Sequence, residues 1–366
     1  MPERLYVGTR KGLVVVDRHR DTWEPVDLHL PSVPVTAVLV GADGQLTVGA
    51  DHGHYGPKLH QSTDGGTTWH DLAVPAYPAP EEVELDPVRR EEVPWATSLL
   101  WALAAGDPDD PGVLWCGTMP GGLFRSTDGG ASWELNLPLW DQPSRPEWFG
   151  GGYDHPAIHS VVPDPRGPER LVVGVSCGGA WRTVDGGASW EPGRGMAARY
   201  MPPDRIDDPT IQDPHRIVRC PAAPDVLWTQ HHSGIFRSTD DGVTWTEVTE
   251  AGPSTFGFAV AVHPTDPDTA WFVPAVADDQ RIPVDGRFVV TRTRDGGASF
   301  DVLSDGLPPA PAYDLVYRHA LEVAPDGDRL AMGSTTGSLW TSDDQGDSWA
   351  LTSAHLPPVN VVAFAP

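Results

Sequence analysis

One short phrase recurs along this chain and constrains its fold more than any other feature. It reads STDGGASW at residues 126–133 and returns, with few changes, at 62–69, 183–190, 238–245, 293–300 and 342–349. All six copies fit one template: Ser or Thr, any residue, Asp, any residue, Gly, two residues, aromatic. Six matches in one pattern are not a product of chance, so the chain is built from a repeated structural unit.

The phrase has the chemistry of a tight turn between two strands. The Asp accepts hydrogen bonds from the backbone of its own turn, the Gly takes a positive φ, and the aromatic ring anchors the turn. An eroded seventh copy, VDRHRDTW, ends at Trp23 and has Arg18 where the Asp would stand. The seven aromatic residues lie 46 to 64 residues apart, a period that predicts an array of small sheets.

Each repeat reads as four short strands, which is the pattern of a propeller blade. At the chain ends, residues 5–12 read as a second strand with no first strand before them, and residues 359–366 read as a first strand with nothing after them. We therefore predict one all-β domain over residues 1–366, a seven-bladed β-propeller of four-stranded blades. The C-terminal strand completes the N-terminal blade and removes the open edges of the ring. An open solenoid is the alternative.

Charge and cysteine content limit the partners and the location. The 51 acidic and 25 basic side chains give a formal net charge of −26, which repels nucleic acids and anionic membranes. Cys116, Cys177 and Cys220 have no metal-like spacing, and the first twelve residues lack an apolar signal segment. We expect a reduced, cytoplasmic protein with no nucleic-acid or membrane partner.

The repeats resemble the Asp-box (BNR) repeats of sialidases, sortilin-type receptors, xyloglucanase-type glycosidases and photosystem assembly factors. More narrowly, residues 213–242, 256–264 and 284–300 are similar to bacterial single-propeller proteins that are labelled glycosyl hydrolase or sialidase by their repeats. The resemblance implies the propeller fold. It leaves the activity open, because Asp boxes occur in enzymes and in non-enzymes.

The residues do not match the catalytic set of either enzyme class. Sialidases carry an Arg-Ile-Pro motif ahead of the first box, whereas Arg281-Ile282-Pro283 stands in the sixth blade, between its second and third strands. Xyloglucanase-type enzymes pair two propellers with a carboxylate from each, and this sequence accounts for one propeller.

The first strands of the blades suggest a site at one end of the channel. The innermost strands begin in register at Thr36, at Trp101 or Ala102, and at His159, His215, Phe258, His319 and Asn360. Histidine at this position acts as a general acid or base, ligates a metal, or only fills the channel mouth. We predict His159, His215 and His319 as candidate catalytic residues. The same three, with His232 or a loop carboxylate as a substitute ligand, are candidates for holding a divalent metal, and the alternative is a metal-free site.

The long insertions point to the same end of the ring. They span 51–58, 71–96, 134–155, 191–213 and 277–286, and strand alternation places them where the innermost strands begin. The candidate ligand-binding residues there are Arg281, Arg318, Gln230, His231, Tyr153 and Arg199.

Two classes of function follow from this pattern. The first is a hydrolase or lyase-type enzyme that binds a polar small molecule or glycan-like ligand at the channel mouth. The second is a non-catalytic propeller that binds a protein partner or assists assembly, in which the histidines are structural. Protein-binding faces favour exposed aromatic anchors, whereas this mouth is rich in histidine and carboxylate, which favours the small-molecule site.

Overall fold

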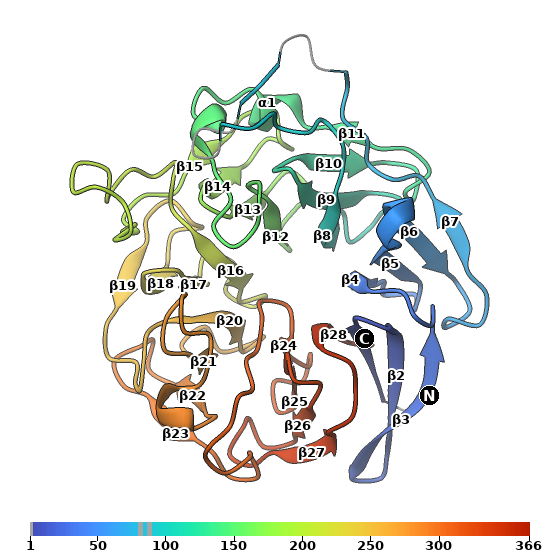
Figure 1. Cartoon of the computed structure of the whole chain (residues 1–366), viewed down its shortest axis with the longest axis vertical. Coiled ribbons are helices and arrows are strands. Elements are labelled where there is room, and N and C mark those ends of the chain that lie inside the picture. The colour runs from blue at the N-terminus through green and yellow to red at the C-terminus, as the bar shows by residue number, and fades with distance from the viewer. Residues whose placement is uncertain (1–2, 80–82, 86–89) are drawn as a thin grey trace.

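The computed structural model describes residues 3–79, 83–85 and 90–366. Within these residues, seven four-stranded antiparallel sheets stand in a ring around a central channel (Figure 1). The predicted seven-bladed β-propeller is therefore confirmed. In the same described ranges, we find no helix with the length and apolar character needed to cross a membrane.

The blades follow one another along the chain, and the strands of each blade run in order from the channel to the outer edge. Blade 1 is β28 (Val359–Phe364), β1 (Arg4–Thr9), β2 (Gly12–His19) and β3 (Thr22–His29). Blade 2 is β4 (Val35–Val40), β5 (Leu46–Asp51), β6 (Pro57–Ser62) and β7 (His70–Leu72). Blade 3 is β8 (Leu99–Ala105), β9 (Leu114–Met119), β10 (Leu123–Ser126) and β11 (Glu134–Leu135). Blade 4 is β12 (Ile158–Pro163), β13 (Leu171–Val175), β14 (Gly179–Thr183) and β15 (Glu191–Pro192).

The remaining three blades have the same order. Blade 5 is β16 (Pro214–Arg219), β17 (Leu227–His231), β18 (Gly234–Ser238) and β19 (Thr246–Val248). Blade 6 is β20 (Gly257–Val262), β21 (Ala270–Pro274), β22 (Val290–Thr293) and β23 (Asp301–Leu303). Blade 7 is β24 (Leu321–Val323), β25 (Leu330–Gly333), β26 (Leu339–Ser342) and β27 (Ala350–Ser353). Short helices lie in the connections: η1 (Gly53–Tyr55), α1 (Leu137–Trp140), η2 (Arg145–Glu147) and η3 (Val284–Gly286).

The two ends of the chain close the ring, as the sequence predicts. β28 pairs antiparallel with β1, and the register sets Leu5 opposite Phe364 and Gly8 opposite Val361. The main-chain N–H of Val362 also donates to the carbonyl of His319, so β28 is tied to blade 7 as well as to blade 1. This strand therefore joins the last blade to the first.

The recurring phrase folds into the same turn each time it appears. At residues 126–133, the Ser126 hydroxyl donates to Asp128 Oδ1 at 2.8 Å and accepts from the N–H of Gly130 at 2.8 Å. Asp128 then accepts from the N–H and the hydroxyl of Ser132 at 2.9 and 2.6 Å. Gly130 has a φ of 91°, a conformation that favours glycine. The same four bonds recur at the turns that carry Asp64, Asp185, Asp240, Asp295 and Asp344.

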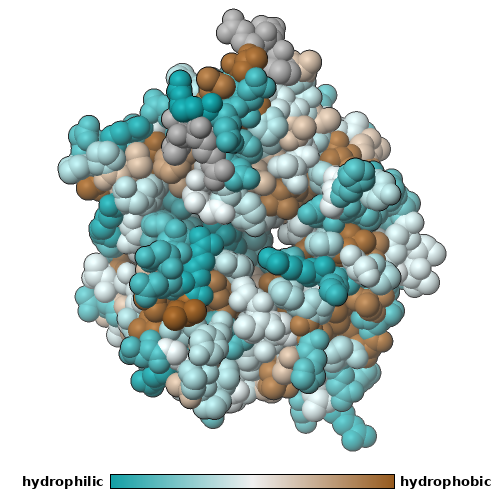
Figure 2. All heavy atoms as spheres, viewed as in Figure 1, coloured by the Kyte–Doolittle hydropathy of each residue, from teal (hydrophilic) through white to brown (hydrophobic). Residues whose placement is uncertain are grey.

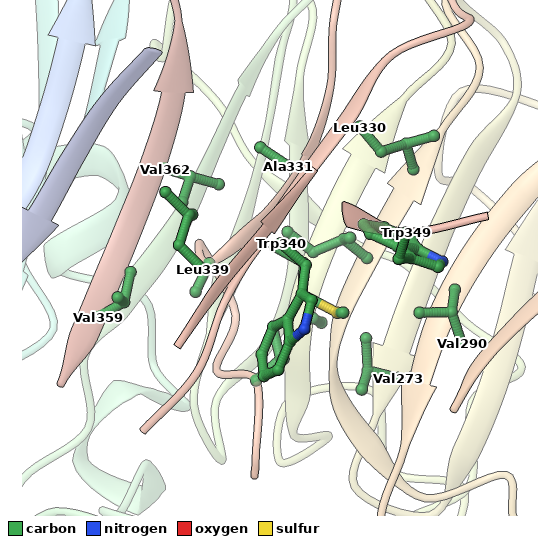
Figure 3. Packing of buried hydrophobic residues seen from close by; sticks show 14 of the residues in the cluster. Val273, Val290, Leu330, Ala331, Leu339, Trp340, Trp349, Val359 and Val362 are labelled. Atoms are coloured by element: carbon green, nitrogen blue, oxygen red, sulfur yellow. The ribbon is translucent and has the colours of Figure 1, made fainter. Parts of the chain in front are cut away.

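Apolar side chains fill the space between adjacent blades. In the largest group, Val290 of blade 6, Trp340 of blade 7 and Val362 of blade 1 belong to one buried cluster (Figure 3). Burying a side chain of this size contributes roughly 1.5–3 kcal/mol. Because each blade packs on two neighbours, the ring holds its inner strands, and the residues at their ends, at fixed places around the channel.

Candidate functional site

The inner strands of blades 1 to 6 share an irregularity near their first residues, and in blade 7 His319 precedes the inner strand β24. The pairing register shifts by one residue in five of these strands. The shift leaves one residue of each strand without a partner in the adjacent strand: Thr36 in β4, Trp101 in β8, His159 in β12, His215 in β16 and Asn360 in β28. In β20 the pairing skips Phe258 together with Ala259. Such β-bulges re-aim a side chain out of the sheet. The register predicted from the sequence is therefore present, and Trp101 rather than Ala102 holds the position in blade 3.

A cavity of about 590 Å³ lies at this end of the channel. Figure 2 shows the ring hollowed near its centre, with hydrophilic side chains over part of the rim. The inner strands line the cavity with Thr36, Trp101, His215, Phe258, His319 and Asn360. Residues of the predicted long loops also line it: Asp51, Gly151, Gly152, Tyr153, Asp213, Asp278 and Arg281. The other lining residues are Arg10, Pro34, Leu99, His232, Tyr317 and Arg318. In the insertion at 71–96, residues 80–82 and 86–89 lie outside the described residues.

Arg318 places a buried positive charge in the wall of this cavity. Its guanidinium lies over the ring of Trp101, 4.8 Å from the ring centroid, and over Phe258 at 5.5 Å. Within the described parts of the chain, its Nε has no hydrogen-bond partner and the group forms no ion pair. Burial lowers the pKa of Arg318, and the nearby Asp213 opposes that shift. A buried guanidinium that has aromatic neighbours but no carboxylate partner is a natural binding group for an anion.

Arg281 adds a second guanidinium beside the first. Its charged group lies 5.3 Å from the centroid of Phe258, and Nη2 donates to the carboxylate of Asp278 at 2.5 Å. Tyr153 packs edge-on to Trp101, with the ring centroids 4.8 Å apart. Arg281, Arg318 and Tyr153, three of the predicted ligand-binding residues, therefore lie together in the cavity wall.

His215, His232 and Asp213 form a compact polar group on the blade 5 side of the cavity. Asp213 Oδ2 lies 3.4 Å from His215 Nε2 and 3.5 Å from His232 Nδ1. His215 Nδ1 lies 2.7 Å from the carbonyl oxygen of Gly257 and donates to it, since a carbonyl only accepts. The imidazole also stacks on Phe258 at 4.6 Å, so its orientation is fixed from two sides.

Burial sets the protonation of this group. Burial lowers the pKa of His215, although the adjacent carboxylate of Asp213 works in the opposite direction. For Asp213, burial opposes ionisation, but the proximity of the two imidazoles holds its pKa well below the ordinary value. A neutral imidazole and an ionised carboxylate therefore stand side by side, and His215 Nε2 is the nitrogen free to accept a proton or a metal ion.

His319 and His159 have different surroundings. Arg216 Nη1 donates to His319 Nδ1 at 3.1 Å, so in the neutral ring the proton lies on Nε2. His319 and Trp101 also line a second cavity of about 200 Å³ further along the channel, with Arg216 and Glu322. His159 is fully buried outside the large cavity, bonded to Ser160 and packed 5.6 Å from Trp101. Burial holds the pKa values of both histidines well below the ordinary value.

Three predicted ligand-binding residues do not line the cavity. The Gln230 amide donates to main-chain carbonyls, including that of Thr255. His231 is buried against the main-chain N–H groups of Asp213 and Ser233, and burial lowers its pKa to about 3. Arg199 is half exposed and pairs with Glu247. Their polar atoms hold the loops of blade 5 in place.

Asp213 is a candidate site residue that the sequence reasoning did not name, although it allowed for a loop carboxylate as a ligand. It marks the end of the 191–213 insertion and precedes the Pro-His pair that opens β16, so it stands two residues from His215. This two-residue spacing is the sequence feature that could have identified Asp213, because residues i and i+2 on extended backbone point to the same side. In the described residues, Asp213, His215 and His232 form the group whose ligand atoms all lie within 4.8 Å of one another. His159 and His319 stand apart from it.

Comparisons with known proteins place the chain among propellers that include glycosidases. We find no protein-family model that matches it. Over 288 residues, or 71% of this chain, it is 24% identical to a probable oligoxyloglucan-reducing end-specific xyloglucanase of Neosartorya fischeri. The matched part is 33% of that protein, so the chain spans about a third of the length of the curated relative. The protein is thus a seven-bladed β-propeller with distant homology to xyloglucanases of the GH74 type.

Two solved structures show the same fold. An ancestral GH74 enzyme superposes with a TM-score of 0.59 and 15% identity, covering 98% of this chain and 39% of that one. YCF48 bound to D1 peptide superposes with a TM-score of 0.57 and 18% identity, covering 94% of this chain and 90% of that one. At these identities the likeness concerns the fold.

Proposed function

We propose that the cavity at the channel mouth binds a polar, sugar-like small molecule that carries an anionic group, and that the protein acts on it as a hydrolase or lyase. The observation that carries this proposal is Arg318, a buried guanidinium in the cavity wall that forms no ion pair in the described residues. Burying a charge without a partner is costly, and a bound carboxylate or phosphate removes that cost.

The rest of the wall suits a sugar-like molecule. Trp101, Tyr153 and Phe258 offer apolar ring faces and edges, while Asn360 and Thr36 offer hydrogen-bonding groups to hydroxyls. The Thr36 hydroxyl has no hydrogen-bond partner among the described residues. The distant homology to a xyloglucanase, whose name describes action on an oligosaccharide, supports the same ligand class.

His215 is the candidate general base. Its Nε2 is free of a donor, its ring is held by the Gly257 carbonyl and by Phe258, and it lines the cavity. In a hydrolytic step, this nitrogen takes a proton from water as the water oxygen bonds to carbon; the bond from that carbon to the leaving oxygen breaks, and the leaving oxygen takes a proton from solvent. In an elimination, the nitrogen takes a proton from carbon, a carbon–carbon double bond forms as the bond to the leaving oxygen breaks, and that oxygen takes a proton from solvent.

The first experiment compares acidic sugars with their neutral counterparts by thermal shift. Glucuronate and galacturonate are expected to raise the melting temperature of the protein, while glucose and galactose leave it unchanged. Oligosaccharides that contain the stabilising acid are then incubated with the protein and analysed by mass spectrometry. Hydrolysis adds the mass of water, whereas elimination adds none and leaves a double bond that absorbs ultraviolet light. Product that forms equally fast with His215→Ala would contradict the role given to His215.

A second candidate function is non-catalytic binding of a protein segment. It is favoured by the likeness to YCF48, which extends over 94% of this chain and whose structure contains a D1 peptide. In that case, peptides that end in a free carboxylate bind to the cavity, their amidated forms bind weakly, and no sugar acid stabilises the protein. The two candidates thus give opposite results in the same thermal-shift assay.

A further inference from the structure

Three potential metal-ligand atoms converge on one point at the edge of the cavity. Asp213 Oδ2 lies 3.4 Å from His215 Nε2 and 3.5 Å from His232 Nδ1, and all three atoms lie within 4.8 Å of one another. Asp213 and His215 are buried, and His232 is a quarter exposed. All three residues line the 590 Å³ cavity.

The hydrogen bonds around this group leave two acceptors facing each other. His215 gives its Nδ1 proton to the carbonyl of Gly257 at 2.7 Å, so a neutral ring has a bare lone pair on Nε2. That lone pair stands 3.4 Å from a carboxylate oxygen, which also has only lone pairs to offer. Two such atoms repel each other in a buried site unless a positive charge lies between them. A proton or a metal ion supplies that charge.

The surroundings fix the three side chains in the manner of a metal site. The main-chain N–H of Cys177 donates to the other carboxylate oxygen of Asp213 at 3.2 Å, and the main-chain N–H of His232 donates to the Asp213 carbonyl at 2.9 Å. The Gly257 carbonyl orients His215 through the ring nitrogen remote from the convergence point. Metal-bound histidines are commonly held by such a bond, which sets the tautomer and strengthens the donor nitrogen.

We propose that Asp213, His215 and His232 bind one divalent first-row transition-metal cation, such as Zn²⁺, with open coordination positions toward the cavity. Two imidazole nitrogens and one carboxylate oxygen suit this class of ion, whereas Mg²⁺ and Ca²⁺ prefer oxygen ligands alone. This ligand set replaces two of the predicted histidines, His159 and His319, with Asp213. The inference rests on the proposed function in one respect: the cation is placed to hold an oxygen of the substrate whose anionic group lies on Arg318. With the cation bound, His215 Nε2 is a metal ligand and no longer accepts a proton, so a water molecule held by the cation takes its place in activating the attacking oxygen.

The test is metal binding to the full-length protein after treatment with a chelator. Titration with Zn²⁺ in competition with a chromogenic chelator is expected to give one tight site, and Co²⁺ is expected to produce a visible absorption band of a nitrogen-ligated ion. His232→Ala, the least buried ligand, should weaken Zn²⁺ binding by more than about 100-fold, because loss of an outer-shell partner alone costs 10–100-fold. Asp213→Asn should do the same.

Matched variants separate this site from other histidines. His54→Ala removes an exposed histidine outside the cavity, and His159→Ala and His319→Ala remove the two histidines that stand apart. All three should bind Zn²⁺ as the parent does. Equal Zn²⁺ affinity in the parent, His232→Ala and Asp213→Asn overturns the proposal, as does a parent with no tight site.

The metal titration uses no sugar, so its outcome is independent of the ligand assay. If Zn²⁺ binding is lost in His232→Ala while no sugar acid binds to the protein, the cation site stands and the proposed function falls. If sugar acids bind through Arg318 while no metal binds, the cation site falls and the proposed function stands.

Discussion

Glu322 shows how the channel changes the chemistry of a single residue. It lines the smaller cavity with Arg216, and its Oε2 accepts from the main-chain N–H of Phe364 at 3.2 Å. Burial raises the pKa of this carboxyl from 4.5 to about 7, although the Phe364 bond and Arg216 work against the shift. The folded protein therefore holds a proton on Glu322 at a pH where an unfolded chain has lost it.

This shift predicts a pH-dependent effect of Glu322→Gln on stability. A carboxyl whose folded pKa is raised contributes stability that is fully present below pH 4.5 and is lost as pH rises through about 7. In Glu322→Gln the amide stays neutral at every pH, so the variant does not lose this stability as pH rises. We expect the variant to match the parent at pH 4 and to exceed it at pH 8 by up to about 3 kcal/mol. Urea unfolding at the two pH values measures the difference, and a variant that is less stable at pH 8 would show that Glu322 is ionised and well solvated.

At the scale of the element, the repeated turn carries the fold. Each turn has a carboxylate that accepts hydrogen bonds within the turn. The main cause is the Thr68 N–H at Asp64 and the Ser189 hydroxyl at Asp185, and these bonds lower the pKa of both carboxyls to about 2. The stabilising effect of these two groups is present above the ordinary pKa of 3.8 and is lost as pH falls toward 2. The turns are therefore expected to loosen together in acid.

Removing one such carboxylate should affect stability and leave the site unchanged. Asp128→Ala deletes the bonds from Ser126 and Ser132, and we expect a melting temperature lower by about 2–4 °C. Affinity for any ligand of the cavity should not change, because Asp128 is not among its lining residues. Calorimetry measures the melting temperature, and ligand titration on the same sample measures the affinity. A variant with normal melting but weaker binding would mean that the turns take part in ligand binding.

These turns also explain why the fold could be predicted and much of the site could not. The turn depends on residues within eight positions of one another, and the shared first position of the inner strands follows from aligning the repeats, so both are visible in the sequence. The partners of a side chain in the channel come from several blades. Arg318 meets Trp101 of blade 3 and Phe258 of blade 6, and His231, which looked like a site residue, turns toward its own loops. Only the assembled ring decides these contacts.

At the scale of the whole molecule, the closing strand makes the seven blades interdependent. Val359 and Val362 of β28 are buried in the apolar cluster shared with blade 7, and Val361 is buried on the side of blade 2. Deletion of residues 359–366 should lower the free energy of unfolding by about 5 kcal/mol or more, since it exposes this apolar surface and opens the ring.

A milder variant keeps this prediction testable if the truncated chain does not fold. Val362→Ala should cost about 1–3 kcal/mol, whereas Val302→Ala on the exposed outer strand β23 should cost little. Denaturant unfolding compares the variants with the parent. A truncated chain as stable as the parent would contradict closure by β28.

The closed ring also places the residue on which the proposed function depends. It carries Arg318 into the cavity wall without a carboxylate partner in the described residues, and we propose that this positive charge selects an anionic ligand. The most direct measurement is isothermal titration of the parent, Arg318→Ala and Arg199→Ala with the sugar acid that gives the largest thermal shift. We predict that Arg318→Ala weakens binding by at least about 10-fold, while the surface variant Arg199→Ala binds as the parent does. Equal affinity in the parent and Arg318→Ala would contradict this claim.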